Sequence, residues 1–259
     1  MTLNKPNHLF DSSVLHKHLS IMVLAAGNSS RLGQNKQLVS IDNKVLLARC
    51  FDNLKGLQQQ LKQSDENNLF SSKLYCVTGF DQHKLYDSVS FDEVTPVYND
   101  DWQSGLGSSI ACGVKTIADD QEDNHLSVNK RLHRDQTEQP LTSTKTINAC
   151  LLVLADQWRL TQQSLFDFVI RWSQQSHYIL VSEYNNRVGP PVIFPEHYYP
   201  ELKALSGTRG AYSILKNHTS RVIQQPFPEA EFDLDKPEDL NQINQYQYKQ
   251  SQAKQGTAL

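Results

Sequence analysis

Residues 24–36 read LAAGNSSRLGQNK and follow an apolar run, IMVL, at residues 21–24. The apolar run predicts a buried strand, and the glycines and small polar residues after it predict a loop. Glycines such as Gly27 permit backbone angles that a side chain disfavours, and small neighbours let backbone N–H groups approach an anion. Arg31 and Lys36 add positive charge. A loop of this composition at the end of a strand indicates a triphosphate-binding site.

The spacing of this loop excludes a P-loop, in which four residues separate the two glycines and lysine follows the second directly. Here five residues separate Gly27 from Gly33, and Lys36 comes three positions later. Taken alone, Lys36 could be a surface lysine and Arg31 could pair with a structural carboxylate. The complete loop pattern favours phosphate contact for both side chains.

Composition excludes several classes of function. The 259-residue chain has a formal net charge of −3, which gives no basic surface for nucleic acid. No apolar run approaches the ~18 residues that span a bilayer, and residues 1–19 lack the apolar core of a secretion signal. The four cysteines form no C-x-x-C pair, which fits buried thiols in a reducing compartment. We therefore expect a cytoplasmic protein that contacts neither nucleic acid nor membrane.

Strand-like and helix-like runs alternate along the chain, which predicts an α/β fold with a mostly parallel sheet covered by helices on both faces. Ligands in such folds bind at the carboxyl ends of the strands. The loop after residue 24 and Asp156 both fall at such ends. The predicted strands span residues 21–24, 73–78, 94–98, 149–154, 177–181, 191–194 and 221–224. The predicted helices span residues 45–61, 82–89, 108–118, 163–173, 211–217 and 237–246.

Polar segments divide the chain into a domain and its appendages. One domain is expected over residues 20–246, after an N-terminal tail at 1–19 and before a disordered tail at 247–259. Residues 119–146 are polar and of mixed charge, which predicts a surface insertion. The insertion is either a partner-docking loop or a tolerated surface extension, and the second is the commoner case.

Several segments match a known family in order. Residues 24–36 fill every fixed position of the pattern LAAG-x-S-x-R-(M/L)-G-x-x-K. The later matches are YNDDWQSGLGSS at 98–109, LADQ at 154–157, GPPVIF at 189–194, LSGTRGA at 205–211 and DLDKPEDL at 233–240. Over about residues 20 to 242, the chain resembles the nucleotidyltransferase family that includes molybdenum cofactor cytidylyltransferase. The resemblance implies a GT-A-like nucleotidyltransferase fold.

The same resemblance implies a reaction and the residues that perform it. Nucleotidyl transfer depends on charge neutralisation and positioning, because phosphoryl chemistry needs little covalent help from protein. Lys36, Arg31 and Asp156 are the expected catalytic residues. Asp156 and Asp235 are the expected ligands of Mg²⁺, which accepts one or two carboxylates together with phosphate oxygens and water. Asp233 is an alternative to Asp235, and Asp156 alone could also be a helix cap.

Nucleotide recognition is expected to involve backbone groups at the ends of the early strands. Family members that open with A-A-G tend to use CTP, whereas relatives with glycine at the position of Ala26 tend to use GTP. Ala26 therefore implies CTP, because its methyl group fills space that a purine edge would need. Gly79 has an alternative role as a turn residue. The expected nucleotide-binding residues are Leu24, Ala25, Ala26, Gly27, Arg31, Lys36, Gly79, Gly105 and Ser109.

Three positions depart from the family pattern. Trp158 replaces a proline, Thr208 replaces an aspartate on the expected acceptor side, and Lys236 replaces a threonine. Trp158 could stack on a flat pterin or pack against a helix, and packing is the commoner role of a tryptophan.

The resemblance implies transfer of CMP from CTP to the terminal phosphate of molybdopterin, and delivery of the product to a molybdenum hydroxylase. One alternative is a cytidylyltransferase for another phosphorylated acceptor. The other is a non-catalytic, cofactor-binding maturation factor for a molybdenum hydroxylase.

Overall fold

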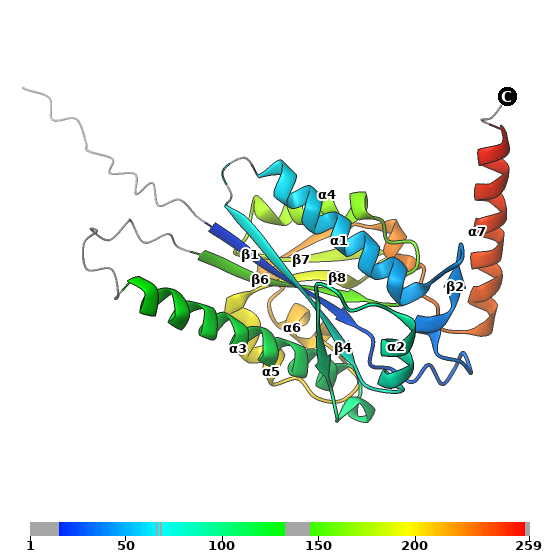
Figure 1. The fold of residues 1–259 in the computed structure, drawn as a ribbon. Helices are drawn as coiled ribbons and strands as arrows, with labels where there is room; N and C mark the ends of the chain where they lie inside the picture. Colours follow the sequence, from blue (N-terminus) through cyan, green and yellow to red (C-terminus); the bar gives the residue numbers. More distant parts are fainter. Residues whose placement is uncertain (1–15, 66, 68, 133–145, 257–259) are drawn as a thin grey trace, which may run out of the picture.

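The computed structural model describes residues 16–65, 67, 69–132 and 146–256, and its centre is a seven-stranded sheet (Figure 1). The strand order is β5-β4-β1-β6-β8-β7-β9. The strands are β1 (His16–Leu24), β4 (Phe70–Thr78), β5 (Val94–Tyr98), β6 (Thr146–Leu154), β7 (Ile179–Tyr184), β8 (Arg187–Pro195) and β9 (Val222–Pro226). A separate two-stranded ribbon joins β2 (Ser40–Ile41) and β3 (Lys44–Val45).

The direction of the strands confirms the predicted, mostly parallel sheet. β1 pairs in parallel with β4 and β6, and β4 pairs in parallel with β5. β8 runs antiparallel to both of its neighbours, β6 and β7, whereas β7 and β9 are parallel. Within the described sheet, β8 is thus the one reversed strand. The carboxyl ends of β1, β4 and β6 meet at one edge, where parallel-sheet proteins place their ligands.

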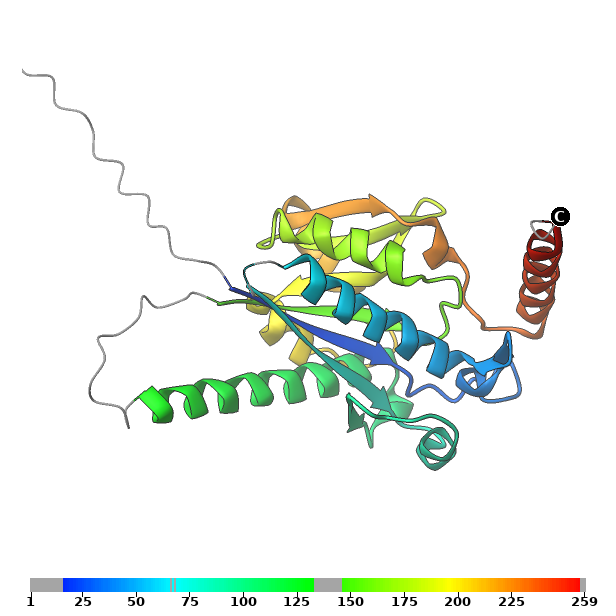
Figure 2. The ribbon, with the colours of Figure 1, turned by 45° about the horizontal axis from the view of Figure 1, so that its top comes forward.

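Helices cover both faces of the sheet, as the alternating pattern predicts (Figures 1 and 2). One face packs against α1 (Leu46–Ser64) and α4 (Gln162–Ser173), and the other against α3 (Leu106–Leu132), α5 (Tyr199–Lys203) and α6 (Tyr212–Asn217). β1 shows why, because its successive side chains point to opposite faces. Alternate β1 residues therefore join the two cores: Ile21 and Val23 the first, and Met22 and Leu24 the second.

A third apolar cluster holds the loop that follows β1. Leu32 of this loop is buried with Trp158, Leu234 and Ile243. Ile243 belongs to α7 (Pro237–Gly256), which stands beside the β2–β3 ribbon at the edge of the molecule (Figure 1). The remaining helix, α2 (Gln82–Ser88), has about two turns and follows β4. The cluster therefore joins the loop, the segment after β6 and the C-terminal helix on one side of the sheet.

Several elements are longer than predicted, and β1, α3 and α7 extend well into segments expected to be tails or an insertion. β1 begins at His16, because residues 17–20 pair with both β4 and β6 although they are not uniformly apolar. α3 continues to Leu132 through much of the segment expected to be a surface insertion. Asp120 anchors this extension, because its carboxylate pairs with Lys73 Nζ at 2.5 Å and accepts a hydrogen bond from Tyr75 Oη at 3.0 Å.

The C-terminal end also differs from the prediction of a disordered tail at residues 247–259, since α7 reaches Gly256. Gln247 Nε2 donates a hydrogen bond of 3.1 Å to Asp42 Oδ1, which ties this part of α7 to the β2–β3 ribbon. The remaining residues of the predicted tails and insertion, 1–15, 133–145 and 257–259, lie outside the described residues.

Candidate active site

A cavity of about 630 Å³ opens at the carboxyl ends of β1 and β6. Nine of the residues predicted from the sequence to act in catalysis or binding line it: Leu24, Ala26, Gly27, Arg31, Lys36, Gly105, Ser109, Asp156 and Asp235. Asn28, Gln37, Trp102, Gln103, Leu106, Leu154, Thr208 and Asp233 complete the lining. The structure therefore gathers most of the predicted residues around one shared space.

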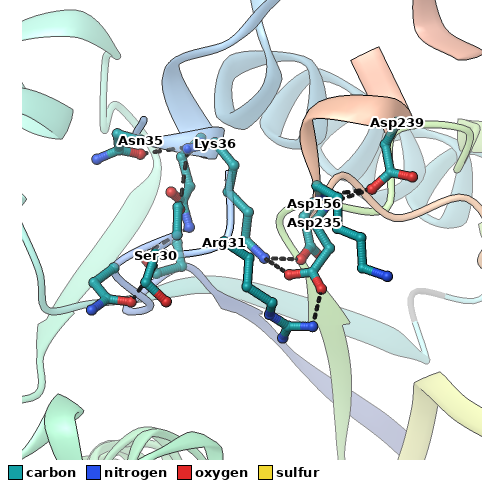
Figure 3. A network of polar contacts seen from close by, with 12 residues as sticks. Ser30, Arg31, Asn35, Lys36, Asp156, Asp235 and Asp239 are labelled. Atoms are coloured by element: carbon teal, nitrogen blue, oxygen red, sulfur yellow. Dashed lines mark hydrogen bonds and ion pairs between the residues drawn. The ribbon is translucent and has the colours of Figure 1, made fainter. Parts of the chain in front are cut away.

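The loop after β1 is fixed by its own polar residues. Asn35 caps the short 3₁₀ helix Lys36–Leu38, because its side-chain oxygen accepts a hydrogen bond of 3.1 Å from the Gln37 backbone N–H. The Lys36 backbone N–H donates to Ser29 Oγ at 3.2 Å. Ser29 itself adopts a left-handed backbone with φ of 54°. These local contacts hold the Lys36 side chain toward the cavity (Figure 3).

Two cations and two carboxylates meet inside the cavity (Figure 3). Lys36 Nζ forms an ion pair with Asp156 Oδ2 and lies 3.9 Å from Asp235 Oδ1. Arg31 forms an ion pair with Asp235 Oδ2. The Lys36 and Asp156 side chains are 16% and 11% exposed, whereas that of Arg31 is 70% exposed. Screening by water is therefore weakest around the Lys36–Asp156 pair and strongest at Arg31.

The segments that carry the carboxylates are locked together by backbone hydrogen bonds. The Leu234 N–H donates to the Asp156 carbonyl at 3.0 Å, and Gln157 forms an antiparallel bridge with Asp233. The buried Gln157 side chain also donates to two carbonyl groups, Pro190 O at 2.8 Å and Ala230 O at 2.9 Å. Asp156 thus stands on a fixed frame with Asp233 and Asp235, although these two residues follow it by almost 80 positions in the sequence.

The electrostatics of the cavity favour an added cation. The pKa of Asp233 is raised above its usual value, first because burial penalises the charged carboxylate and second because of the negative charge of Asp156. Asp156 Oδ1 is buried and has no hydrogen-bond partner in the described part of the chain. A divalent cation would satisfy the oxygen and reduce the repulsion between the carboxylates. Both Asp233 and Asp235 line the cavity, so the choice between them as the second ligand stays open.

The carboxylates do not form a complete protein cage for a metal. Within residues 16–65, 67, 69–132 and 146–256, no group of three or more His, Cys, Asp or Glu side chains has the arrangement of a metal site. A metal ion here would need further oxygen ligands from substrate and water. Mg²⁺ commonly binds in this way, with one or two carboxylates and the phosphates of its nucleotide.

A second part of the cavity lining comes from residues 102–109, before and at the start of α3; its lining side chains carry no charge, and it is called the uncharged end below. Ser109 is 4% exposed, and its hydroxyl oxygen accepts a hydrogen bond of 3.1 Å from Asn99 Nδ2. Gly105 has φ of +111°, and an added Cβ would lie 2.9 Å from the carbonyl oxygen of Gly207. The Gly107 N–H donates to the same carbonyl at 2.8 Å. The segment before Thr208 is therefore held against the start of α3.

Two predicted nucleotide-binding residues lie beside the cavity rather than on its wall. Ala25 is 1% exposed in the core, and its carbonyl accepts a hydrogen bond of 3.4 Å from Gln37 Nε2. Gly79 is buried next to Trp102, where an added Cβ would lie 2.6 Å from Trp102 Cβ. The structure gives Gly79 a packing role in addition to any contact that its backbone makes with a ligand.

The unusual Trp158 is a packing residue. Its side chain is 5% exposed, and its ring packs edge-to-face against Phe232 and Tyr246, at centroid distances of 5.9 and 5.2 Å. Trp158 does not line the main cavity. Of the two roles considered from the sequence, packing is the one that the structure shows. Thr208, by contrast, does line the cavity and leaves an uncharged side chain there.

Comparison with protein families identifies the chain. The family model of the MobA-like NTP transferase domain matches residues 21–222. The chain belongs to this family. It is a nucleotidyltransferase, which agrees with the resemblance carried by its sequence motifs and with the GT-A-like arrangement of its sheet. A comparison with curated proteins finds no match.

Solved structures of 13% to 21% identity show the same fold. A nucleotidyl transferase from Methanothermobacter thermautotroptrophicus (Mth528) has a TM-score of 0.62 and 13% identity over 90% of this chain and 98% of that one. Rv0371c from Mycobacterium tuberculosis has a TM-score of 0.59 and 19% identity over 87% and 96% of the chains. Its homologue from Mycobacterium sp. strain JC1 has a TM-score of 0.59 and 21% identity, covering 89% and 97%.

The MobA-like site contains features that sequence reasoning missed. Trp102 was noted only as part of a motif, yet it lines the cavity. Gln157 was noted only as part of LADQ, yet it ties three segments together. Both roles depend on residues distant in sequence, so the motifs alone gave no signal for them.

Among the helices that the structure describes, none combines the length and apolar character needed to cross a membrane.

Proposed function

We propose that this nucleotidyltransferase transfers CMP from CTP to the terminal phosphate of molybdopterin, giving molybdopterin cytosine dinucleotide and pyrophosphate. One observation carries the catalytic part of the proposal. Lys36 and Arg31 meet Asp156 and Asp235 in one cavity at the carboxyl ends of β1 and β6. Such a cluster provides positive charge for a triphosphate and oxygen ligands for its metal ion in the same place.

In the proposed reaction an oxygen of the acceptor phosphate attacks the α-phosphorus of CTP. The new oxygen–phosphorus bond forms as the bond to the bridging oxygen of the β-phosphate breaks, and pyrophosphate leaves with that electron pair. Lys36 and Arg31 would neutralise negative charge on the triphosphate and on the leaving group. Their present partners are Asp156 and Asp235, so binding of the polyanion exchanges these ion pairs for contacts with phosphate.

The metal in this proposal is Mg²⁺, held by Asp156 with Asp235 or Asp233. The fit rests on the buried Asp156 Oδ1, which has no hydrogen-bond partner among the described residues, and on the raised pKa of Asp233. A bound Mg²⁺ would supply charge neutralisation at the phosphates. Rv0371c, which shares the fold, has also been solved in complex with manganese, at 19% identity to this chain. Mn²⁺ is therefore a practical probe for the site.

The choice of CTP rests on Ala26, which lines the cavity and is 5% exposed. Its methyl group occupies room that a purine would need. Calorimetric titration of CTP and GTP in the presence of Mg²⁺ tests this choice. Binding of GTP at least as tight as that of CTP would refute it.

The acceptor is the least constrained part of the proposal. Thr208 leaves the acceptor side without the aspartate usual in the family, so a different phosphorylated acceptor is the first alternative. A synthase of 4-diphosphocytidyl-2C-methyl-D-erythritol from Anaerococcus prevotii shares the fold, with a TM-score of 0.53 and 9% identity over 89% and 96% of the chains. That likeness keeps methylerythritol phosphate among the acceptors to be tested.

A non-catalytic, cofactor-binding maturation factor is the second alternative, motivated by Thr208, by Trp158 and by the polar segment 119–146. The intact group of Lys36, Arg31 and Asp156 favours catalysis, because a pure binding module does not need to hold both metal and triphosphate. Transient contact with a molybdenum hydroxylase and a cytoplasmic location remain predictions of the cytidylyltransferase proposal.

A screen of acceptors with CTP and GTP, read out as pyrophosphate release, tests the proposed function. We expect release with CTP and molybdopterin, dependence on Mg²⁺, and loss of release in Asp156→Asn. Turnover with methylerythritol phosphate and none with molybdopterin would transfer the assignment to the first alternative. Molybdopterin binding without turnover under any condition would favour the maturation factor.

A further inference from the structure

We infer that Trp102 forms an aromatic wall against which the nucleobase stacks, and this inference rests on the proposed nucleotide-binding function. Trp102 begins the 3₁₀ helix Trp102–Ser104 after β5 and lines the cavity while remaining partly exposed. It stands at the uncharged end with Gly105 and Ser109. The cations and carboxylates belong to the β1 loop and to the segments after β6 and β9, which leaves the uncharged end for the base.

The neighbours of Trp102 fix its position. Gly79 lies between the carbonyl of Ala26 and the side chain of Trp102, where an added Cβ would be 3.0 Å from Ala26 O and 2.6 Å from Trp102 Cβ. The Phe80 ring supports the indole in an edge-to-face arrangement with a centroid distance of 5.4 Å. The Phe80 N–H donates to the Ala26 carbonyl at 3.1 Å. Trp102 is therefore placed directly beside the strand end that presents Ala26.

The surroundings distinguish an aromatic wall from a simple core tryptophan. Trp158 and Trp172 are 5% and 1% exposed and pack inside apolar clusters. Trp102 instead packs at the margin of a cluster and contributes surface to the cavity. A planar base gains about 1–3 kcal/mol from stacking on an aromatic side chain, as measured by alanine substitution. Loss of the wall should then weaken nucleotide binding by roughly 5- to 150-fold.

Stacking on Trp102 would contribute affinity for a base but not selectivity between bases, because an indole face accepts any planar heterocycle. The choice would be made at the edge of the base, by Ala26 and by the polar groups around Ser109. Removing Trp102 should therefore weaken binding of CTP and leave binding of the triphosphate chain alone unchanged.

Tryptophan fluorescence of the full chain tests the inference, because the chain has three tryptophans and two of them are buried away from the cavity. The probes are CTP, GTP, inorganic tripolyphosphate and a free pterin, each with Mg²⁺. The variants are Trp102→Phe, which keeps a ring, and Trp102→Leu, which keeps apolar bulk. Trp158→Phe is the control, and thermal unfolding verifies that every variant is folded.

We expect CTP to quench fluorescence in the wild-type chain and in Trp158→Phe but not in Trp102→Phe. Calorimetry should show CTP affinity reduced at least 5-fold in Trp102→Leu, nearly unchanged in Trp102→Phe, and tripolyphosphate affinity equal in all. Equal CTP affinity in Trp102→Leu and the wild type would overturn the inference. So would loss of affinity for the pterin but not for CTP, which would assign the wall to the acceptor.

The proposed function can fail separately. Quenching by GTP and not by CTP, lost in Trp102→Phe, would retain the aromatic wall and refute the cytidine assignment.

Discussion

The two ends of the cavity are built in different ways. The charged end uses side chains from three distant segments, and its ion pairs join Arg31, Lys36, Asp156 and Asp235. The uncharged end uses an aromatic ring and close backbone contacts, such as that of Gly105 with Gly207. At the charged end, residue type determines the chemistry. At the uncharged end, the shape of the cavity wall determines which ligand fits. That shape depends on packing between distant residues, which no single residue in the sequence reveals.

The largest effect is expected at the charged end, from Asp156→Asn. The change removes a charged ligand of the expected metal and the partner of Lys36. Turnover should fall by more than the roughly 10²–10³-fold typical of losing one charge-stabilising donor. Steady-state pyrophosphate release measures it, and the melting temperature should stay close to the wild-type value. Asp87→Asn, on the exposed surface of α2, is the matched control and should keep full activity.

Lys36→Ala should give the next largest effect and separates two roles of the lysine. Loss of the cation should lower turnover roughly 10²–10³-fold. At the same time, affinity for Mn²⁺ without nucleotide should rise, because the ammonium group no longer neutralises Asp156. Electron paramagnetic resonance of free Mn²⁺ measures the second effect, with Lys62→Ala on the exposed side of α1 as the control. Weaker Mn²⁺ binding in Lys36→Ala would show that the lysine supports the metal site rather than competing for it.

Gly105→Ala tests the uncharged end through backbone shape. Gly105 has φ of 111° and ψ of −167°, a conformation that is almost restricted to glycine, and the new methyl would meet Gly207. We expect about 1–3 kcal/mol of lost stability and weaker CTP binding, measured by denaturant unfolding and calorimetry. Gly27→Ala is the control for stability, since no described atom beyond its chain neighbours lies within 4 Å of its added Cβ. Equal unfolding free energies for the two variants would contradict the account.

Asp233→Asn should have the smallest effect, and it should increase the stability of the fold rather than lower it. The raised pKa of Asp233 means that folding disfavours its charged form, so its contribution to stability declines as pH rises through that pKa. The variant should therefore be more stable than the metal-free wild type at pH 7. The gain should stay below about 1 kcal/mol, because the carboxyl group is only partly desolvated: much of the Asp233 residue stays exposed, and water screens its charge. The unfolding curves of the wild type and of Asp233→Asn should converge below about pH 4, where the aspartic acid is protonated and as neutral as the asparagine that replaces it.

The sequence predicted the charged end better than the uncharged end for a physical reason. Apolar strands end at residues 24 and 154, so parallel-sheet geometry alone places the β1 loop and Asp156 at one edge. Segment 233–235 could be assigned there only by resemblance, because its position depends on the bridge between Gln157 and Asp233. The aromatic wall was not predicted, since Trp102 gains its place from Gly79 and Phe80.

The same distinction holds for the fold. Six predicted helices and seven predicted strands correspond to described elements, because apolar periodicity reports burial directly. The extension of α3 was missed, because it depends on polar partners on the neighbouring strand, Lys73 and Tyr75, for Asp120. Polar residues that look solvated in a sequence can hold an element in place once a distant partner is present.

The central claim is that the loop after β1 and the aspartates beside it bind one triphosphate and its metal ion together. A crystal structure with CTP and Mn²⁺, with the metal located by its anomalous scattering, tests this claim most directly. We predict a manganese peak between Asp156 and the 233–235 segment, with the triphosphate contacting both Arg31 and Lys36. A metal peak outside the cavity, or a triphosphate bound away from these two cations, would contradict the account.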